Sequence, residues 1–244
     1  MIEICCGSYE DALNAYYGGA KRIELNSALY LGGLTPSVAS LKLIKETTDL
    51  KVICMVRPRG GGFCYSDSEF KQLLGEAKDL LENGADGLAF GFLRENREID
   101  LEKTKILISL IKDYKKEAVF HRAYDCVTNP YTSIELLIDL GVDRLLTSGL
   151  QEKAFDGKEL IRELQEKYGS SIELLVGSGI NASNARAIKE YTGVTQLHSS
   201  CKDWQEDPTT SGDHVNYCYG PTDHKNEFEI VNRNLVENLV TLDL

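Results

Sequence analysis

The sequence predicts a (β/α)₈ barrel, an α/β fold, formed by a single domain over residues 1–244. Three observations predict this fold: eight short apolar runs typical of buried strands, helical patterns between them, and a glycine that recurs at the end of every second helix. The length of 244 residues also suits one barrel, since such barrels typically contain roughly 250 residues.

The predicted strands alternate with helical segments along the whole chain. Strands that alternate with helices favour parallel β/α units, and eight such units favour closure into a barrel. We place the strands at Ile2 to Cys6, Arg22 to Leu25, Val52 to Val56, Gly87 to Phe90, Ala118 to His121, Arg144 to Thr147, Glu173 to Val176 and Thr195 to His198.

The predicted helices have recognisable starts and ends. Residues 70–81 carry an apolar residue at every third or fourth position, which predicts one buried helical face. Starts are indicated by capping-box spacing at Ser66 and Glu69, by similar spacing at Ser8 and Asp11, and by a cap residue before proline at Thr35-Pro36 and Asn129-Pro130. Ends are indicated by glycine, which adopts the left-handed conformation of a helix C-cap, at Gly19, Gly84, Gly141 and Gly193.

A long connection precedes the last predicted helix. Residues 199–226 lack a periodic pattern, and the closing helix is expected at about 227–241, with Phe228 and Leu235 on its buried face. Long loops without secondary structure are often lids or binding loops. We therefore expect this segment to cover the barrel mouth or a neighbouring subunit through Trp204, His214, Tyr217 and Tyr219.

Composition excludes several classes of partner. The net charge of −11 and the isoelectric point near 4.9 disfavour nucleic acid and anionic membranes. No apolar run approaches the roughly 20 residues of a membrane span, and no basic-plus-apolar segment precedes the first strand. Seven cysteines without a CxxC pair indicate reduced thiols. We expect a cytoplasmic protein.

Because side chains alternate in direction along a strand, charged residues of the first two strands should lie inside the barrel. In the first two strands the apolar residues should face the helices, which leaves Glu3, Cys5 and Glu24 facing inward. A buried carboxylate needs a cation or hydrogen bonds. Arg57 follows the third strand, and we predict that it bonds to Glu3 or Glu24. Such a cluster is compatible with an interior ion pair and equally with catalysis.

Polar residues also follow the later strands. Active sites of barrel enzymes lie at the C-terminal rim, and phosphate groups often bind after strands seven and eight. His121 is compatible with a general acid or base, a metal ligand or a hydrogen-bonded core residue. The rim segments are residues 120–125, Thr147-Ser148-Gly149, Gly177-Ser178-Gly179 and His198-Ser199-Ser200.

Five segments in the same order resemble the CutC family of copper homeostasis proteins. They are Arg22-Ile23-Glu24-Leu25, Gly32-Gly33-Leu34-Thr35-Pro36-Ser37, Arg57-Pro58-Arg59-Gly60-Gly61, Phe120-His121-Arg122-Ala123-Tyr124-Asp125 and Leu146-Thr147-Ser148-Gly149. The likeness extends from Ile2 to about Ser200. It implies a cytoplasmic (β/α)₈ barrel that self-associates, is linked to copper tolerance and binds Cu(I).

Two positions depart from the family pattern. Asn26 stands where the family commonly has cysteine, and Gly62 stands where it has aspartate, so both lack a metal ligand. Cu(I) prefers thiolate and thioether donors. We therefore expect weak Cu(I) binding through Cys5, with His121 or His198 supplying nitrogen, and little affinity for Zn(II).

An alternative function is an enzyme that acts on a small anionic or phosphorylated metabolite. Glu24 or Asp125 would act as the base and His121 as the proton donor, while Arg57 and Arg59 would clamp the anion. The other substrate contacts would come from Glu3, Arg122, Thr147, Ser148, Gly177, Ser178, Gly179, His198 and Ser199. A third alternative is an oligomeric scaffold, which a large apolar patch on an outer helix would mark.

Overall fold

A closed barrel of eight parallel strands forms the centre of the computed structural model, which describes residues 1–218 and 220–242. The strands are β1 (Ile2–Cys6), β2 (Arg22–Leu25), β3 (Lys51–Met55), β4 (Gly87–Phe90), β5 (Glu117–Phe120), β6 (Arg144–Thr147), β7 (Glu173–Val176) and β8 (Gln196–Ser199). Pairing follows sequence order, and β8 closes the barrel on β1 through Ile2 and Leu197. The predicted fold is confirmed, with no strand boundary displaced by more than one residue.

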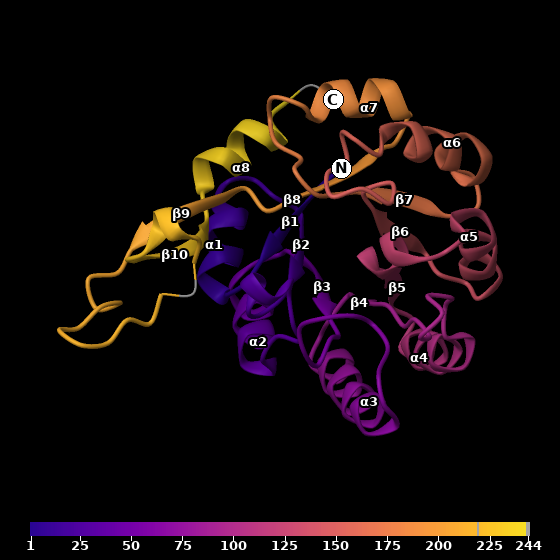
Figure 1. Cartoon of the computed structure of the whole chain (residues 1–244), viewed down its shortest axis with the longest axis horizontal. Helices are drawn as coiled ribbons and strands as arrows, with labels where there is room; N and C mark the ends of the chain where they lie inside the picture. Colours follow the sequence, from indigo (N-terminus) through magenta and orange to yellow (C-terminus); the bar gives the residue numbers. More distant parts are fainter. Residues whose placement is uncertain (219, 243–244) are drawn as a thin grey trace.

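Helices surround the strands, as Figure 1 shows. They are α1 (Tyr9–Tyr17), α2 (Val38–Thr47), α3 (Asp67–Glu82), α4 (Leu101–Asp113), α5 (Pro130–Asp139), α6 (Lys158–Tyr168), α7 (Ala185–Thr192) and α8 (Arg233–Val240), with short 3₁₀ turns η1 (Leu29–Leu31), η2 (Arg122–Cys126) and η3 (Thr222–His224). Within the described ranges, no helix combines the length and apolar character that a membrane crossing requires.

Most of the expected helix ends are confirmed. Helix α2 is the exception, because its N-cap is Ser37, whose side chain accepts the Ser40 N–H, whereas the Thr35 hydroxyl donates to Glu76. The caps at Ser8, Ser66 and Asn129 are present, and the glycines that follow helices at positions 19, 84, 141 and 193 all have positive φ.

The barrel has two apolar layers. The outward residues of the strands, such as Ile4, Cys6 and Ile23, join the large core beneath the helices. Inside the barrel a smaller cluster of Ile53, Met55, Ala89 and Val119 fills the side formed by β3, β4 and β5. The opposite interior side, formed by β8, β1 and β2, is polar and positions the candidate site.

The C-terminal segment differs from the expectation. Residues 227–231 alternate polar and apolar side chains and form strand β10 (Glu227–Val231), which pairs antiparallel with β9 (Lys202–Glu206). The closing helix is therefore only α8, which begins after its N-cap Asn232. The polar and apolar side chains of β10 alternate with a period of two residues, which is typical of a strand, whereas a helix has a period of 3.6 residues.

The hairpin of β9 and β10 lies beside α1 and projects from the ring of helices (Figure 1). The Val231 N–H donates to Asp11 of α1 at 2.8 Å, and Trp204 stacks on His224 with ring centroids 4.0 Å apart. The expectation that this segment covers its own barrel mouth is therefore wrong. A contact with a neighbouring subunit stays a prediction, and Tyr219 lies outside the described residues.

Candidate functional site

A layer of ion pairs fills the barrel interior near the N-terminal ends of the strands. The Glu3 carboxylate lies 2.6 Å from Arg22 and 2.9 Å from Arg144, and all three side chains are buried. Arg144 also pairs with Glu117 at 2.6 Å. Two guanidinium groups thus neutralise Glu3, which meets the requirement that a buried charge be paired.

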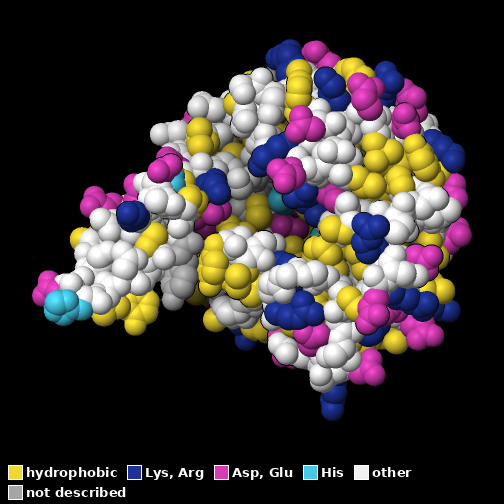
Figure 2. Space-filling view, in the orientation of Figure 1, with side chains coloured by type: hydrophobic (Ala, Val, Ile, Leu, Met, Phe, Trp, Pro, Cys, Tyr) yellow, Lys and Arg dark blue, Asp and Glu magenta, His cyan; other side chains and the backbone are white. Residues whose placement is uncertain are grey.

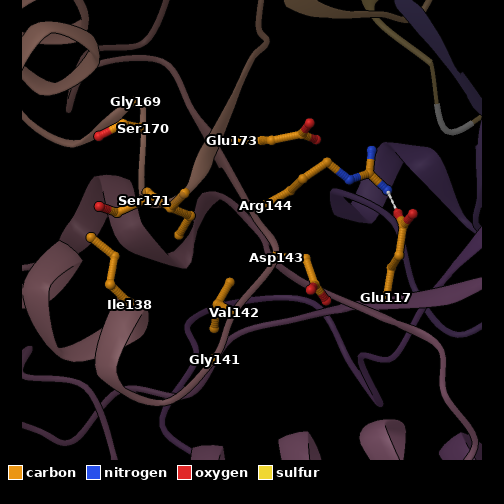
Figure 3. Close-up of a pocket in the computed structure, with 11 residues that line it drawn as sticks. Glu117, Ile138, Gly141, Val142, Asp143, Arg144, Gly169, Ser170, Ser171 and Glu173 are labelled. Atoms are coloured by element: carbon orange, nitrogen blue, oxygen red, sulfur yellow. Dashed lines mark hydrogen bonds and ion pairs between the residues drawn. The ribbon is translucent and has the colours of Figure 1, made fainter.

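A cavity of about 540 Å³ opens beside this layer, at the end of the barrel opposite the rim (Figure 3). Its acidic lining residues already have partners, because Glu117 binds Arg144, Asp143 binds Lys112, and Glu173 accepts from Gln196. In barrels of this kind the N-terminal face commonly serves stability. We assign these charges the same role.

The predicted bond from Arg57 to an interior carboxylate is wrong. The Arg57 guanidinium instead donates to the carbonyl oxygens of Leu31, Gly33 and Gly61, at 2.9, 3.0 and 2.6 Å. Strand register explains this, because Glu24 lies level with Ile53 of β3, and Arg57 lies four residues further along the chain. Arg57 therefore joins two rim loops.

The polar interior side carries a compact donor cluster, formed by Cys5 of β1, Glu24 of β2 and His198 of β8. One ligand atom from each lies within 4.8 Å of the others. His198 Nε2 is 3.4 Å from Glu24 Oε2, and the Cys5 thiol is 3.8 Å from that same oxygen. The Asn26 amide donates to Glu24 at 3.0 Å and to Cys5 Sγ at 3.5 Å. Figure 2 shows a central hollow in the ring with acidic, basic and histidine side chains in it.

Burial and charge set the protonation of this cluster. Burial by itself would raise the pKa of Glu24, but His198 and the Asn26 hydrogen bond lower that pKa to about 2. Burial disfavours the charged form of His198, yet the neighbouring Glu24 and Glu3 raise its pKa overall. Burial and Glu24 raise the pKa of the Cys5 thiol well above its usual value. The cluster thus favours an ionised Glu24, a protonated His198 ring and a neutral Cys5 thiol.

His121 lies at the end of β5 with a different protonation. Its Nδ1 accepts the Ala123 N–H at 3.1 Å, which places the ring proton on Nε2. Burial lowers the pKa of His121 to about 4, so the ring is neutral at pH 7. Among the described residues Nε2 has no hydrogen-bond partner, and the ring packs against Phe63 with centroids 5.0 Å apart.

Asp125 belongs to a separate network at the rim. Its carboxylate accepts from the Thr147 hydroxyl at 2.6 Å, from the N–H groups of Ser148 and Leu150 at 3.1 and 3.2 Å, and from Arg122 at 2.8 Å. These bonds occupy the carboxylate with partners from two loops of the chain itself. Asp125 therefore fixes the loop after β6.

The remaining candidates are distributed around the rim. Arg59 pairs with Glu69 of α3 and donates to nearby carbonyl oxygens, so it closes the glycine-rich loop after β3. The Ser199 hydroxyl donates to Ile180 at 2.6 Å. Gly177 packs against His198, and Ser178 and Gly179 both have positive φ.

Sequence reasoning assigned no role in the site to Arg22, Asn26 or Arg144. Arg22 and Asn26 lie two residues before and after Glu24, so the pattern that turned Glu24 inward also turns them inward. Arg144 starts β6, and no local pattern connects it with Glu3, which is 141 residues away in sequence. Only barrel closure brings those two residues together.

The chain is similar in sequence to proteins of one known family. The CutC family model matches residues 1–203. A CutC family protein of Treponema denticola is 47% identical over 86% of this chain and 84% of its own length, and the human copper homeostasis protein cutC homolog is 40% identical over 83% of this chain and 73% of its own.

Solved structures agree with that match. The crystal structure of the putative copper homeostasis protein CutC from Streptococcus agalactiae has a TM-score of 0.77 and 31% identity, and the match covers 82% of this chain and 98% of that one. The family model covers all eight barrel strands and the donor cluster, whereas most of the C-terminal hairpin and helix α8 lie beyond it. The chain belongs to the CutC family.

Proposed function

We propose that this protein serves copper homeostasis by binding Cu(I) weakly, in the cytoplasm, at the cluster of Cys5, Glu24 and His198. The observation that carries the proposal is the convergence of a sulfur, a nitrogen and an oxygen donor from three strands within 4.8 Å. Relatives that are named copper homeostasis proteins support the choice of metal.

The donor set suits a soft monovalent cation only in part. The Cys5 thiolate is the soft ligand that Cu(I) prefers, and the His198 imidazole is a borderline ligand. Glu24 offers a hard oxygen, so its contribution is negative charge, which offsets the charge of the incoming ion. One thiolate with one imidazole predicts weak binding, and a site without four good ligands predicts little uptake of Zn(II).

Protonation further weakens the site. Metal binding requires the Cys5 thiolate and neutral His198, but the cluster raises the pKa of both groups. Each bound ion therefore displaces protons, and the affinity for Cu(I) should increase as pH rises from 6 to 8. Glu24, with a pKa of about 2, does not take up the thiol proton, which is released to solvent.

An anaerobic competition titration against a Cu(I) chelator tests the proposal. Exposed thiols would bind copper nonspecifically, so the background carries Cys64→Ser and Cys126→Ser. In that background Cys5→Ser should weaken Cu(I) binding by about tenfold or more, because the soft donor is lost. Cys54→Ser is the matched control, since Cys54 is buried on the outward face of β3.

Two results would contradict the proposal. Equal Cu(I) affinity in the background protein and its Cys5→Ser variant would exclude Cys5 as a ligand. Binding that does not strengthen with pH would exclude a site that must lose the thiol proton.

A second candidate function is an enzyme that acts on a small anionic or phosphorylated metabolite at the same mouth. One observation favours it: His121 presents a neutral, unpartnered Nε2–H in a barrel interior that also holds ionised Glu24. Such a donor can polarise a carbonyl oxygen without carrying charge. Metabolite capture by the purified protein, compared with capture by Glu24→Gln and His121→Asn variants, would test this function.

A further inference from the structure

A second pocket, of about 240 Å³, lies on the outer side of the ends of β7 and β8. The loop after β7 contributes Gly179 and Asn181, the end of β8 contributes Ser200 and Lys202, and helix α8 contributes Leu235 and Asn238. Figure 1 shows α7 and α8 on either side of this end of β8. The Cys5 cluster is separate, because none of its residues lines this pocket.

The charge of the lining is unusual for this chain. The protein has a net charge of −11, yet the pocket is lined by one lysine and by no aspartate or glutamate among the described residues. The cavity at the opposite end of the barrel, in contrast, is lined by Glu117, Asp143 and Glu173 (Figure 3). Because Lys202 pairs with Glu229 just outside the lining, an anion would meet less repulsion in this pocket than in that cavity rather than a free positive charge.

The lining also has unused hydrogen-bonding groups. The side chains of Ser200 and Asn238 make no hydrogen bond in the part of the chain that the structure describes, and both are exposed to the pocket. Lys202 lies 3.4 Å from Glu229 and above the Trp204 ring, which leaves two of its ammonium protons for another acceptor. A hydroxyl, an amide and an ammonium group are suitable donors to phosphate oxygens.

Backbone geometry supports the same ligand class. Ser178 and Gly179 have φ of 80° and 78°, and Cys201 has φ of 41°, so both strands end in left-handed turns around the pocket. Turns of this kind can expose several backbone N–H groups to an anion. The ends of strands seven and eight are also the usual phosphate position in (β/α)₈ barrels.

We propose that the pocket between the ends of β7 and β8 and helix α8 binds the phosphoryl group of a small phosphorylated metabolite. Lys202, Asn238 and Ser200, which all line the pocket, supply the hydrogen-bond donors. This inference does not rest on copper binding, since the two sites share no residue.

Calorimetric titration with inorganic phosphate, glycerol 3-phosphate and glycerol tests the proposal. The two phosphates should bind and glycerol should not. Asn238→Asp places a carboxylate in the pocket at an exposed helical position, and it should weaken phosphate binding by about tenfold through charge repulsion. Asn234→Asp is the matched control, because it adds the same charge to an exposed position on the same helix outside the lining.

The outcomes separate this proposal from the proposed function. Tighter binding of glycerol 3-phosphate than of phosphate supports a metabolite, and unchanged phosphate binding in Cys5→Ser shows that the two sites are independent. Absence of phosphate binding by the wild-type protein, or equal weakening in Asn238→Asp and Asn234→Asp, would overturn the phosphate site. Neither result would bear on Cu(I).

Discussion

At the scale of single residues, two buried histidines show how the environment sets chemistry. His198 lies beside two carboxylates that raise its pKa, whereas His121 lies in an environment where burial dominates and lowers its pKa to about 4. Their identical side chains therefore differ in how readily they take up a proton. The sequence identified both residues as candidates but not this difference, because it depends on neighbours from β1 and β2.

The first prediction follows from His121. Its pKa is about 4 in the folded protein and near 6.5 in the unfolded chain, so the unfolded state binds more protons between these values. Stability should therefore decrease as pH falls, by about 2 kcal/mol from pH 6.5 to pH 5. Glu24 contributes little there, because its pKa is about 2 in the folded protein and 4.5 in the unfolded chain, and both values lie below this pH range.

Urea unfolding at several pH values measures this effect. His121→Asn keeps an acceptor for the Ala123 N–H but cannot titrate, so it should reduce the pH dependence between pH 5 and 6.5. His214→Asn, at an exposed position in the hairpin loop, should keep the wild-type dependence. Identical slopes in wild type and His121→Asn would show that His121 does not carry the effect.

At the scale of elements, strand alternation predicts which residues face inward, and register decides which of them meet. The sequence placed Glu3, Cys5 and Glu24 inside the barrel, and the structure agrees. It misassigned the counter-ion because Arg57 follows β3, whereas Glu3 lies level with Arg22 at the other end of the strands. Register across a closed barrel depends on long-range pairing that one sequence does not reveal.

The second prediction concerns this ion-pair layer. Arg144 bridges Glu3 and Glu117 with a side chain that is 1% exposed. Arg144→Met removes a partner from a buried carboxylate and should destabilise the fold by about 3 to 5 kcal/mol. Lys112→Met breaks the exposed pair with Asp143 and should cost less than about 1 kcal/mol. Equal losses in the two variants, measured by urea unfolding, would contradict a structural role for the buried layer.

At the scale of the whole molecule, the barrel was predictable and the hairpin was not. Eight strand–helix units repeat one local pattern, and the positive-φ glycines mark where helices end. The segment 204–226 lacks such a pattern, and it lies beyond the residues that match the family model. The strands β9 and β10 that flank it are held by pairing with each other, so only the complete hairpin shows their conformation.

The last prediction concerns self-association. The hairpin projects from the barrel, and it carries Val215 and Tyr217 with 54% and 68% of their surface exposed. Apolar side chains on a projecting arm are stabilised when a second copy covers them. We therefore expect the wild-type protein to form an oligomer in solution, and we expect the arm to be part of the contact.

A shortened arm tests this expectation. Asp207 and Asn226 face each other at the end of the hairpin, with the Asp207 N–H donating at 2.8 Å, so an Asn-Gly turn can replace residues 208–225. Because none of the described residues between 208 and 225 belongs to the core, the free energy of unfolding of the monomer should change by less than about 1 kcal/mol. Sedimentation velocity should show an oligomer for the wild type and a monomer for the shortened chain. An unchanged oligomer would place the contact on the barrel itself, and a monomeric wild type would exclude self-association under those conditions.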